Sequence, residues 1–177
     1  GTVLKQGILY AIQSADANDM IVTMDSDDSH DPNLIVQMKS EIDAGADLVI
    51  ASRYRKGSKI VGLSTIRKWI SFCAVILFKL LAPIPKVRDY TCGYRGYRVD
   101  LIQRAYKKYG DLMIEEKGFS CMAELLLKLS TFAPVVKELP FTLRYDLKKG
   151  ASKMKIGQTI KQTIKLIYTY RINSLIK

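Results

Sequence analysis

Apolar positions in the N-terminal third of the chain recur at two different spacings, which predict helices alternating with strands. Helical spacing covers residues 3–14, and a short apolar run follows at 20–24. Helical spacing returns at 33–44, where Gly45 ends the helix, and 47–52 has the apolar content of a buried strand. A strand, a helix and a strand in this length form a βαβ unit, so the two strands should run parallel.

The remaining sequence predicts further helices and two extended segments. The helices are expected at residues 69–82, 100–109, 119–129 and from 156 onwards, and the extended segments at 93–99 and 135–144. The apolar helix at 69–82 is too short and too charged to cross a bilayer, which takes ~20 apolar residues, so it should lie at a membrane surface or in the core. After Ile156, Lys161 and Lys165 lie outside an apolar stripe, which is typical of a basic amphipathic helix. Together these elements predict an α/β fold.

Length and composition narrow the class of protein. The chain has 177 residues and 48% hydrophobic content, enough for one domain with a real core. Cys73, Cys92 and Cys121 are odd in number and form no CxxC pair, which argues against a disulfide framework or a zinc knuckle and favours a reducing, cytosol-facing setting. The single histidine, His30, argues against a histidine-built metal site or a Ser-His-Asp triad, and we expect it on a surface loop.

The net charge of +11 is distributed unevenly. Residues 1–52 carry nine acids and two basic residues, residues 53–88 carry nine basic residues and no acid, and residues 144–177 carry nine basic residues and one acid. Such basic blocks could bind nucleic acid, anionic lipid or a phosphorylated substrate. Both blocks also contain long apolar faces, and this favours a membrane surface.

An acidic cluster directly follows the first predicted strand and contains four acids in the seven residues 25–31. Asp25 and Asp27 are two residues apart, so in extended geometry their side chains point the same way and can reach one hard cation. The alternative is an ordinary turn, with Asp31 as N-cap and Pro32 as the first residue of the next helix. We favour the cation, because four clustered acids repel one another unless a positive charge neutralises them.

Short motifs follow one another along almost the whole chain. They are Met24-Asp25-Ser26-Asp27 with Ser29-His30-Asp31-Pro32, Ser52-Arg53-Tyr54, Arg67-Lys68 with Ser71, residues 88–98, Gly118-Phe119 with Glu124, Leu139-Pro140, and Gly150-Ala151-Ser152-Lys153. In this order they resemble the family 2 glycosyltransferases with the GT-A fold, and most closely the branch of dolichyl-phosphate mannose synthases and polyprenyl-phosphate glycosyltransferases. The resemblance implies a Rossmann-like nucleotide-diphospho-sugar transferase sheet with flanking helices.

The chain departs from this family pattern at its N-terminus. Members normally begin with a strand that carries a Pro-Thr-Tyr-Asn-Glu-like motif and continue with a second strand, and together these form the nucleotide pocket. Nothing in this sequence matches them. We therefore expect residues 1–154 to be the C-terminal two thirds of a catalytic domain that lacks its first strands, and residues 155–177 to be a basic amphipathic helix at a membrane surface.

The resemblance also implies roles for individual residues. Asp25 and Asp27 would hold Mg²⁺ or Mn²⁺, and Ser29 stands where the metal shell is often completed. Arg67 and Ser71 are assigned to the acceptor phosphate, and their i,i+4 spacing on one helix face fits a shared grip on one phosphate.

Further basic residues are assigned to phosphates of the donor or the acceptor. These are Arg53, which follows a strand end, Arg144, and Lys153 beside Ser152 in a loop. For each single arginine the alternative is a solvated charge on a basic face.

Two more acids are candidates for the site. The resemblance places Asp89 near the donor sugar. Glu124 lies within an apolar helix, where an unpaired carboxylate would be costly, so it is either a sugar contact or a buried partner of Arg95 or Arg98.

These features predict an inverting, metal-dependent glycosyltransferase at the cytoplasmic face of a membrane. It would move a hexose, most simply mannose, from GDP-mannose or a UDP-sugar to dolichyl or polyprenyl phosphate, an anion that needs no strong general base. One alternative is transfer to a hydroxyl of another glycan or lipid, which would need a base such as Asp89 or Glu124. The other is a non-catalytic basic module that binds membrane or nucleic acid, although the acidic cluster opposes nucleic acid.

Overall fold

The protein is an α/β fold built on a mixed four-stranded sheet, as the sequence predicts. The computed structural model describes residues 1–116, 118, 120–147 and 156–175. The strands lie in the order β1 (Met20–Thr23), β4 (Arg95–Arg98), β2 (Leu48–Ser52) and β5 (Val136–Pro140). β4 is antiparallel to β1 and β2, whereas β2 and β5 are parallel. Because β1 and β2 are both antiparallel to β4, they run parallel to each other, as the βαβ prediction requires. β4 lies between them.

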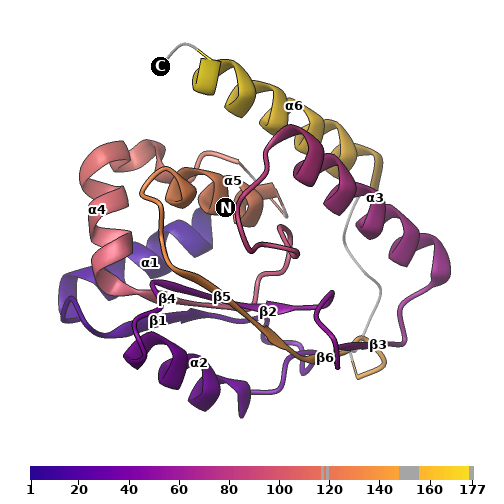
Figure 1. The fold of residues 1–177 in the computed structure, drawn as a ribbon, viewed down its shortest axis with the longest axis horizontal. Coiled ribbons are helices and arrows are strands. Elements are labelled where there is room, and N and C mark those ends of the chain that lie inside the picture. The colour runs from indigo at the N-terminus through magenta and orange to yellow at the C-terminus, as the bar shows by residue number, and fades with distance from the viewer. Residues whose placement is uncertain (117, 119, 148–155, 176–177) are drawn as a thin grey trace.

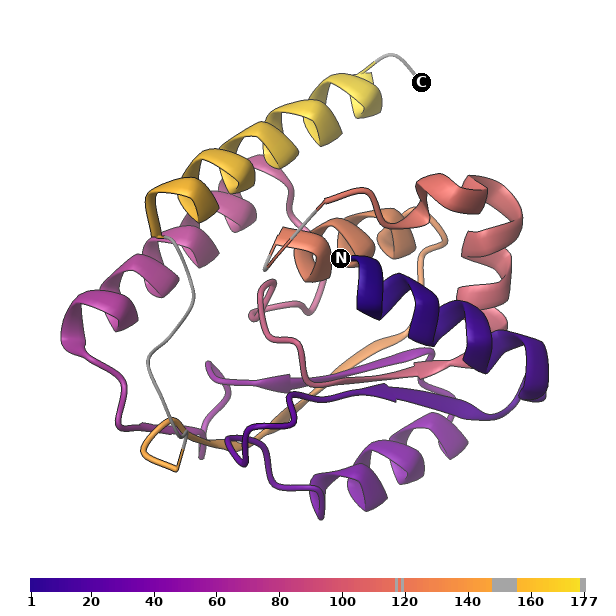
Figure 2. The ribbon, with the colours of Figure 1, turned by 180° about the vertical axis from the view of Figure 1, so that it is seen from behind.

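Helices cover both faces of this sheet (Figures 1 and 2). α2 (Leu34–Asp43) packs on one face, where its buried side chains are Leu34, Met38 and Ile42. The other face is covered by α1 (Thr2–Ser14), α4 (Val99–Tyr109) and α5 (Ser120–Ser130). A single 3₁₀ turn (Gly110–Met113) follows α4. Nearly the whole of α5 is buried, because it lies between the sheet and an outer pair of helices.

The outer pair consists of α3 (Thr65–Leu81) and α6 (Ile156–Leu175), which lie side by side (Figures 1 and 2). α6 also contacts α5, and Ile167 reaches the main core with only 2% of its surface exposed. Within the described part of the chain, no helix combines the length and the apolar content that crossing a membrane requires.

A small parallel sheet connects the outer helices to the main body. It pairs β3 (Lys59–Val61), which leads into α3, with β6 (Thr142–Arg144). Gly62 follows β3 at φ +78°, and a Cβ there would lie 2.5 Å from the backbone nitrogen of Asp146. A side chain at this position would therefore displace backbone, which fixes glycine at the start of the segment that leads to α3.

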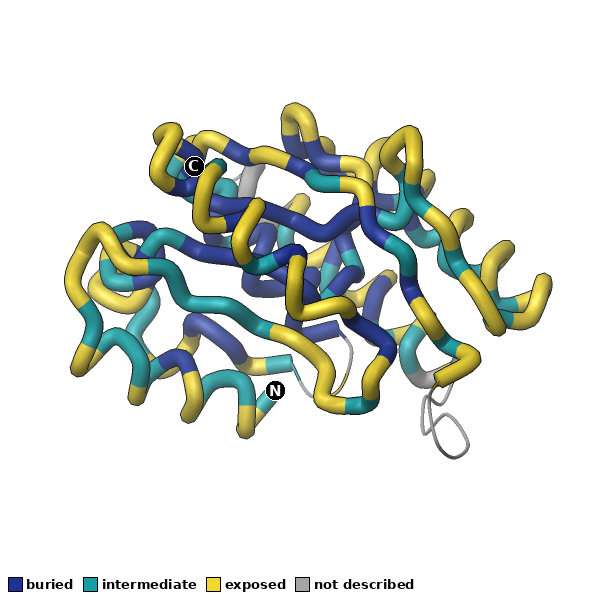
Figure 3. Tube along the Cα trace, turned by 90° about the horizontal axis from the view of Figure 1, so that it is seen from below, coloured by how far each residue is buried: buried dark blue, intermediate teal, exposed yellow. Residues whose placement is uncertain are grey.

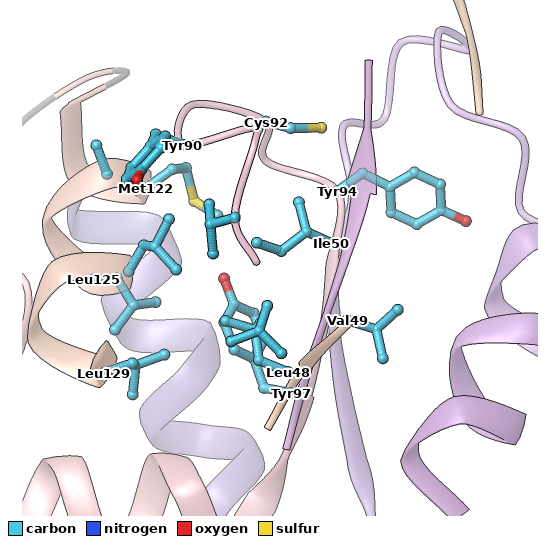
Figure 4. Packing of buried hydrophobic residues seen from close by; sticks show 14 of the residues in the cluster. Leu48, Val49, Ile50, Tyr90, Cys92, Tyr94, Tyr97, Met122, Leu125 and Leu129 are labelled. Atoms are coloured by element: carbon cyan, nitrogen blue, oxygen red, sulfur yellow. The ribbon is translucent and has the colours of Figure 1, made fainter. Parts of the chain in front are cut away.

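The core follows from strict alternation along the inner strands (Figure 4). Leu48 of β2 and its register partner Tyr97 of β4 point towards Leu125 of α5. Val49 and Tyr94 point the other way, towards α2. All five residues of β2 are buried, whereas all four of β1 are half-buried at the edge of the sheet (Figure 3). A groove of about 770 Å³ runs along β1 on its α1 side.

Several errors of the sequence prediction concern the boundaries of helices and strands. α3 begins at Thr65 rather than at residue 69, and the short strand β3 gave no recognisable pattern. α2 begins at Leu34, so the prediction that Asp31 caps it and Pro32 opens it is wrong. Asp31 instead accepts hydrogen bonds from the backbone and side-chain nitrogens of Asn33, both at 2.9 Å, and thus closes a turn before the helix.

Candidate active site

The polar residues predicted for the site converge because of how the strands are directed. β1, β2 and β5 all end at one edge of the sheet, and the antiparallel β4 begins there. In the ladder, Arg95 of β4 stands opposite both Thr23 and Ile50, and Ser52 stands opposite Pro140. The segments that follow Thr23 and Ser52 and the segment that precedes Arg95 therefore meet at this edge, which is where ligands bind in open α/β sheets.

The acidic cluster forms a tight loop, which we call the aspartate loop (residues 24–31). It begins where the Thr23 hydroxyl donates to the Gly93 carbonyl at 2.7 Å, and it reverses at Asp28, whose φ is +61°. Asp27 Oδ1 accepts the Ser29 amide at 3.2 Å and the Ser29 hydroxyl at 2.5 Å. Asp25 is exposed, and its carboxylate accepts no hydrogen bond from the described residues.

His30 does not lie on the surface, so that prediction is wrong. Only 7% of its surface is exposed, because its ring stacks on Tyr94 at 4.9 Å and meets Phe141 edge-on at 5.6 Å. Its Nδ1 accepts the backbone amide of Asp25 at 3.2 Å. Tyr94 in turn donates its hydroxyl to the Asp31 carbonyl at 2.8 Å. Burial, followed by the charge of Asp31, raises the pKa of Tyr94 to about 12, so its hydroxyl keeps its proton for this bond.

The second acidic centre pairs Asp89 with Arg53 through two parallel hydrogen bonds. Arg53 Nε donates to Asp89 Oδ2 and Nη2 donates to Oδ1, both at 2.7 Å. The backbone amide of Arg53 adds a third bond to Oδ2 at 3.0 Å, and Nη2 also donates to the Thr91 hydroxyl at 2.6 Å. Such a bidentate pair fixes the guanidinium plane. Among the described residues no acceptor is hydrogen-bonded to Arg53 Nη1.

Asp89 is fully buried and its carboxylate is saturated with donors. Besides Arg53, the amides of Thr91 and Cys92 donate to Oδ1 at 3.2 and 3.0 Å. Burial alone would raise the pKa of Asp89, but the Arg53 charge and hydrogen bonds outweigh it and hold that pKa below its usual value. Burial, reinforced by the Asp89 charge, raises the pKa of the Cys92 thiol to about 12, so Cys92 stays neutral. This centre is a rigid, charge-balanced anchor.

Glu138 of β5 anchors the segment that contains Asp89. Its Oε1 accepts the backbone amides of Arg88 and Asp89 at 2.7 and 2.9 Å. Glu138 was not predicted as a site residue, although a signal existed: it shares the buried face of β5 with Val136, where an apolar residue is expected. Tyr54 and Thr91 were also missed, and nothing in their spacing distinguished them.

The aspartate loop suits a hard divalent cation that keeps part of its water shell. Asp25 and Asp27 supply carboxylate oxygens, the ligands such cations prefer, and Asp25 is open to solvent. Ser29 is only 2% exposed and its hydroxyl is directed at Asp27, so it orients that carboxylate. Within the described residues no group of three or more His, Cys, Asp or Glu side chains gathers around one point. The pair therefore fits an ion whose other ligands are water and phosphate oxygens.

α3 brings the predicted acceptor residues into one helix. Arg67 and Ser71 are both half-buried and lie one turn apart. The Ser71 hydroxyl is 2.8 Å from the Tyr54 hydroxyl, and the Arg53 guanidinium lies over the Tyr54 ring at 5.5 Å. Tyr54 thus links the start of α3 to the Arg53–Asp89 centre. Burial raises the pKa of Tyr54, which keeps its hydroxyl protonated.

Glu124 is buried but does not pair with Arg95 or Arg98, so that alternative is wrong. Its Oε1 binds the Lys128 ammonium at 2.6 Å, and its Oε2 accepts the amides of Glu115 and Glu116 at 2.9 and 2.8 Å. A lysine one helical turn away therefore supplies the charge that the sequence analysis sought in an arginine.

The two arginines considered for Glu124 have other partners. Arg95 is fully buried and donates to the carbonyls of Tyr90 and Met122, whereas Arg98 pairs with Asp47. Through these two carbonyls, Arg95 connects the segment before β4 to α5.

The remaining predicted residues lie farther along the chain. Arg144 is exposed and forms a bidentate ion pair with Asp146, while its backbone amide donates to the Ser29 carbonyl at 3.0 Å. β6 is therefore hydrogen-bonded to the aspartate loop. Ser152 and Lys153 lie outside the described residues.

Comparison with known proteins shows the family of the chain. A sequence profile of glycosyl transferase family 2 matches residues 4–105, more than half of the chain. The chain belongs to this family. Its members generally use a divalent cation.

Three curated relatives carry related names. The chain is 31% identical to a dolichol-phosphate mannosyltransferase of Pyrococcus furiosus over 166 residues, which cover 93% of this chain and 44% of the relative. It is 32% identical to an undecaprenyl-phosphate mannosyltransferase of Micrococcus luteus (78% and 54% covered) and 30% identical to a polyprenol monophosphomannose synthase of Mycolicibacterium smegmatis (82% and 52% covered). The chain spans about half the length of these relatives.

Proposed function

We propose that this family 2 glycosyltransferase moves a hexose, most simply mannose, with inversion from a nucleotide diphosphate sugar to a dolichyl or polyprenyl phosphate. The observation that carries the proposal is the meeting of two kinds of charge at one sheet edge: the carboxylates of the aspartate loop, of which Asp25 is exposed, and the anchored guanidinium of Arg53. The names of the three relatives support the choice of mannose and of a lipid phosphate.

On the donor side, Asp25 and Asp27 would hold Mg²⁺ or Mn²⁺, which when bound stabilises the negative charge that builds on the leaving diphosphate. Arg53 acts on the same charge. Because Asp89 fixes the guanidinium plane through Nε and Nη2, Arg53 presents Nη1 without rearranging. The donor is GDP-mannose or a UDP-sugar.

On the acceptor side, a phosphate monoester is already anionic and needs positioning rather than deprotonation. Arg67 and Ser71 would grip this phosphate, with Ser71 oriented by Tyr54. The acids that a hydroxyl acceptor would need as a base are committed elsewhere: Asp89 to Arg53, and Glu124 to Lys128 and two amides. This commitment favours a phosphate over a hydroxyl acceptor.

The outer helices would rest on an anionic membrane at its cytoplasmic face. Exposed large apolar side chains follow α3 at helical spacing, namely Ile66, Trp69, Phe72, Ile76 and Leu80, and α6 adds Ile160, Ile164 and Tyr168. Lys68, Lys79, Lys161 and Lys165 are exposed on the same two helices. Apolar insertion combined with lysines near lipid headgroups is how interfacial helices bind.

A matched pair of variants tests the membrane contact. Trp69→Glu should release the full-length protein from anionic liposomes, whereas Val36→Glu, an equally exposed apolar position on α2, should not. Liposome binding should fall with salt and keep a salt-resistant part. Equal retention of both variants would contradict this arrangement.

The chemistry is tested by offering the full-length protein GDP-mannose with either polyprenyl phosphate or the unphosphorylated polyprenol. Lipid-linked sugar should form only with the phosphate. Comparable product from polyprenol would favour transfer to a hydroxyl, and no product with any nucleotide sugar would favour a non-catalytic module.

A further inference from the structure

The aspartate loop is closed by a histidine that has no place in the chemistry described above. His30 is the only histidine of the sequence, and it is buried although it lies within an acidic loop. Its ring packs against both Tyr94, which precedes β4, and Phe141, which follows β5, and these two rings also contact each other. The ring is therefore held by residues from two other segments, next to β4 and β5, that do not carry the aspartates.

One nitrogen of this fixed ring reaches back across the loop. Nδ1 of His30 accepts the amide of Asp25, the second residue after β1. An acceptor at Nδ1 carries no proton, so the neutral ring has its proton on Nε2. The bond spans five residues and joins the two ends of the loop, while the Asp27–Ser29 bonds lie inside it.

We infer that His30 is a positioning residue that sets the direction of the Asp25 carboxylate. The reasoning is geometric: the Asp25 amide and carboxylate share one Cα, so fixing the amide limits where the carboxylate can point. Residues that orient ligand groups typically change metal affinity by about 10–100-fold when they are removed. The inference rests on the proposed function of the aspartate loop, and it deepens it by naming what holds the loop ready.

Two substitutions separate this role from simple packing, because they remove opposite halves of the side chain. His30→Phe keeps an aromatic ring packed against Tyr94 and Phe141 but has no acceptor. His30→Asn loses the ring but places an amide oxygen close to where Nδ1 stands. A packing role predicts that the Phe variant resembles wild type, whereas a positioning role predicts that the Asn variant does.

The first measurement needs no metal and no activity. Hydrogen exchange of the Asp25 amide in the full-length protein is followed by mass spectrometry with residue-level fragmentation. We expect the Asp25 amide to exchange about tenfold faster in His30→Phe than in wild type, and within about threefold of wild type in His30→Asn. Equal exchange in wild type and His30→Phe would overturn the inference.

The second measurement is calorimetric titration with the Mn²⁺ complex of pyrophosphate, a probe that does not depend on the nucleotide base. Binding should weaken about tenfold in His30→Phe and recover in His30→Asn. If wild type binds the probe and His30→Phe binds it equally well, the inference about His30 is overturned, while the proposed function of the loop stands. Absence of wild-type binding would instead overturn the proposed cation and diphosphate function of the loop.

Discussion

Two acidic centres lie at the same edge of the sheet and use their charge in opposite ways. The Asp89 carboxylate is fully buried and takes hydrogen bonds from Arg53 and from two further amides. The Asp25 carboxylate is exposed and accepts none from the described residues. A saturated carboxylate organises its neighbours, and an open one is available to a ligand. The position of an acid at a strand end therefore does not tell which of the two it is.

The largest difference between the two acidic centres should appear in how much each one stabilises the fold. Asp89→Asn leaves the Arg53 guanidinium largely buried with its charge unpaired, which should lower the free energy of unfolding by about 3–5 kcal/mol. Urea denaturation measures this, and Asp25→Asn serves as the chemically identical control with no loss. Similar unfolding energies for the two variants would remove the distinction between the centres.

Substitutions in the aspartate loop should reduce the transfer activity and leave the stability of the fold intact. Asp25→Asn or Asp27→Asn should reduce transfer by about 100–1,000-fold, the cost of losing one group that stabilises developing charge. Stability should hold or rise, because one of several repelling charges is removed. Transfer assays with and without EDTA measure the effect, and full activity in EDTA would refute a cation at this loop.

A smaller effect should distinguish the anchored arginine from the one on α3. Arg67→Ala should raise KM for polyprenyl phosphate at least about tenfold, since a charged hydrogen bond to phosphate contributes roughly 1.5–3 kcal/mol, and leave nucleotide-sugar binding unchanged. Lys107→Ala, which removes an exposed positive charge on α4, is the control. If donor and acceptor kinetics weaken equally in Arg67→Ala, this residue belongs to the donor site.

The smallest expected effect is a change of stability with pH. The pKa of folded Asp89 lies below its ordinary value of 3.8, so its ion pair stabilises the protein fully above that value and less as pH falls through the lowered folded pKa. The stability gap between wild type and Asp89→Asn should thus stay constant from pH 7 to about pH 5 and narrow only below about pH 4. Narrowing already at pH 6 would mean that the Asp89 pKa is not lowered.

The sequence predicted which segments meet at one sheet edge better than it predicted the state of their residues. Strand direction alone brings Asp25, Asp27 and Arg53 to one edge, so a correct strand pattern sufficed. The burial of Asp89 depends on Arg53, which lies 36 residues away, and no local pattern encodes that pairing. His30 shows the same limit, because aromatic neighbours from two distant segments of the chain decide its burial.

Helix starts were misplaced for a related reason. Asp31 has the sequence features of an N-cap, and its carboxylate does accept a backbone amide. It binds Asn33 in a turn that precedes the helix, so the same chemistry operates outside the helix rather than at its first residue. The roles assigned to Ser152 and Lys153 stay predictions.

The half-buried edge strand β1 has a practical consequence for work with this chain. Its outer edge has no strand partner among the described residues, it adjoins a wide groove, and the exposed Tyr10 and Val36 stand on the helices to either side. An uncovered strand edge with apolar neighbours is a template for pairing with another chain. Preparations of these 177 residues should therefore be handled at low concentration, and a charged residue in place of Val36 is the simplest change to keep them monodisperse.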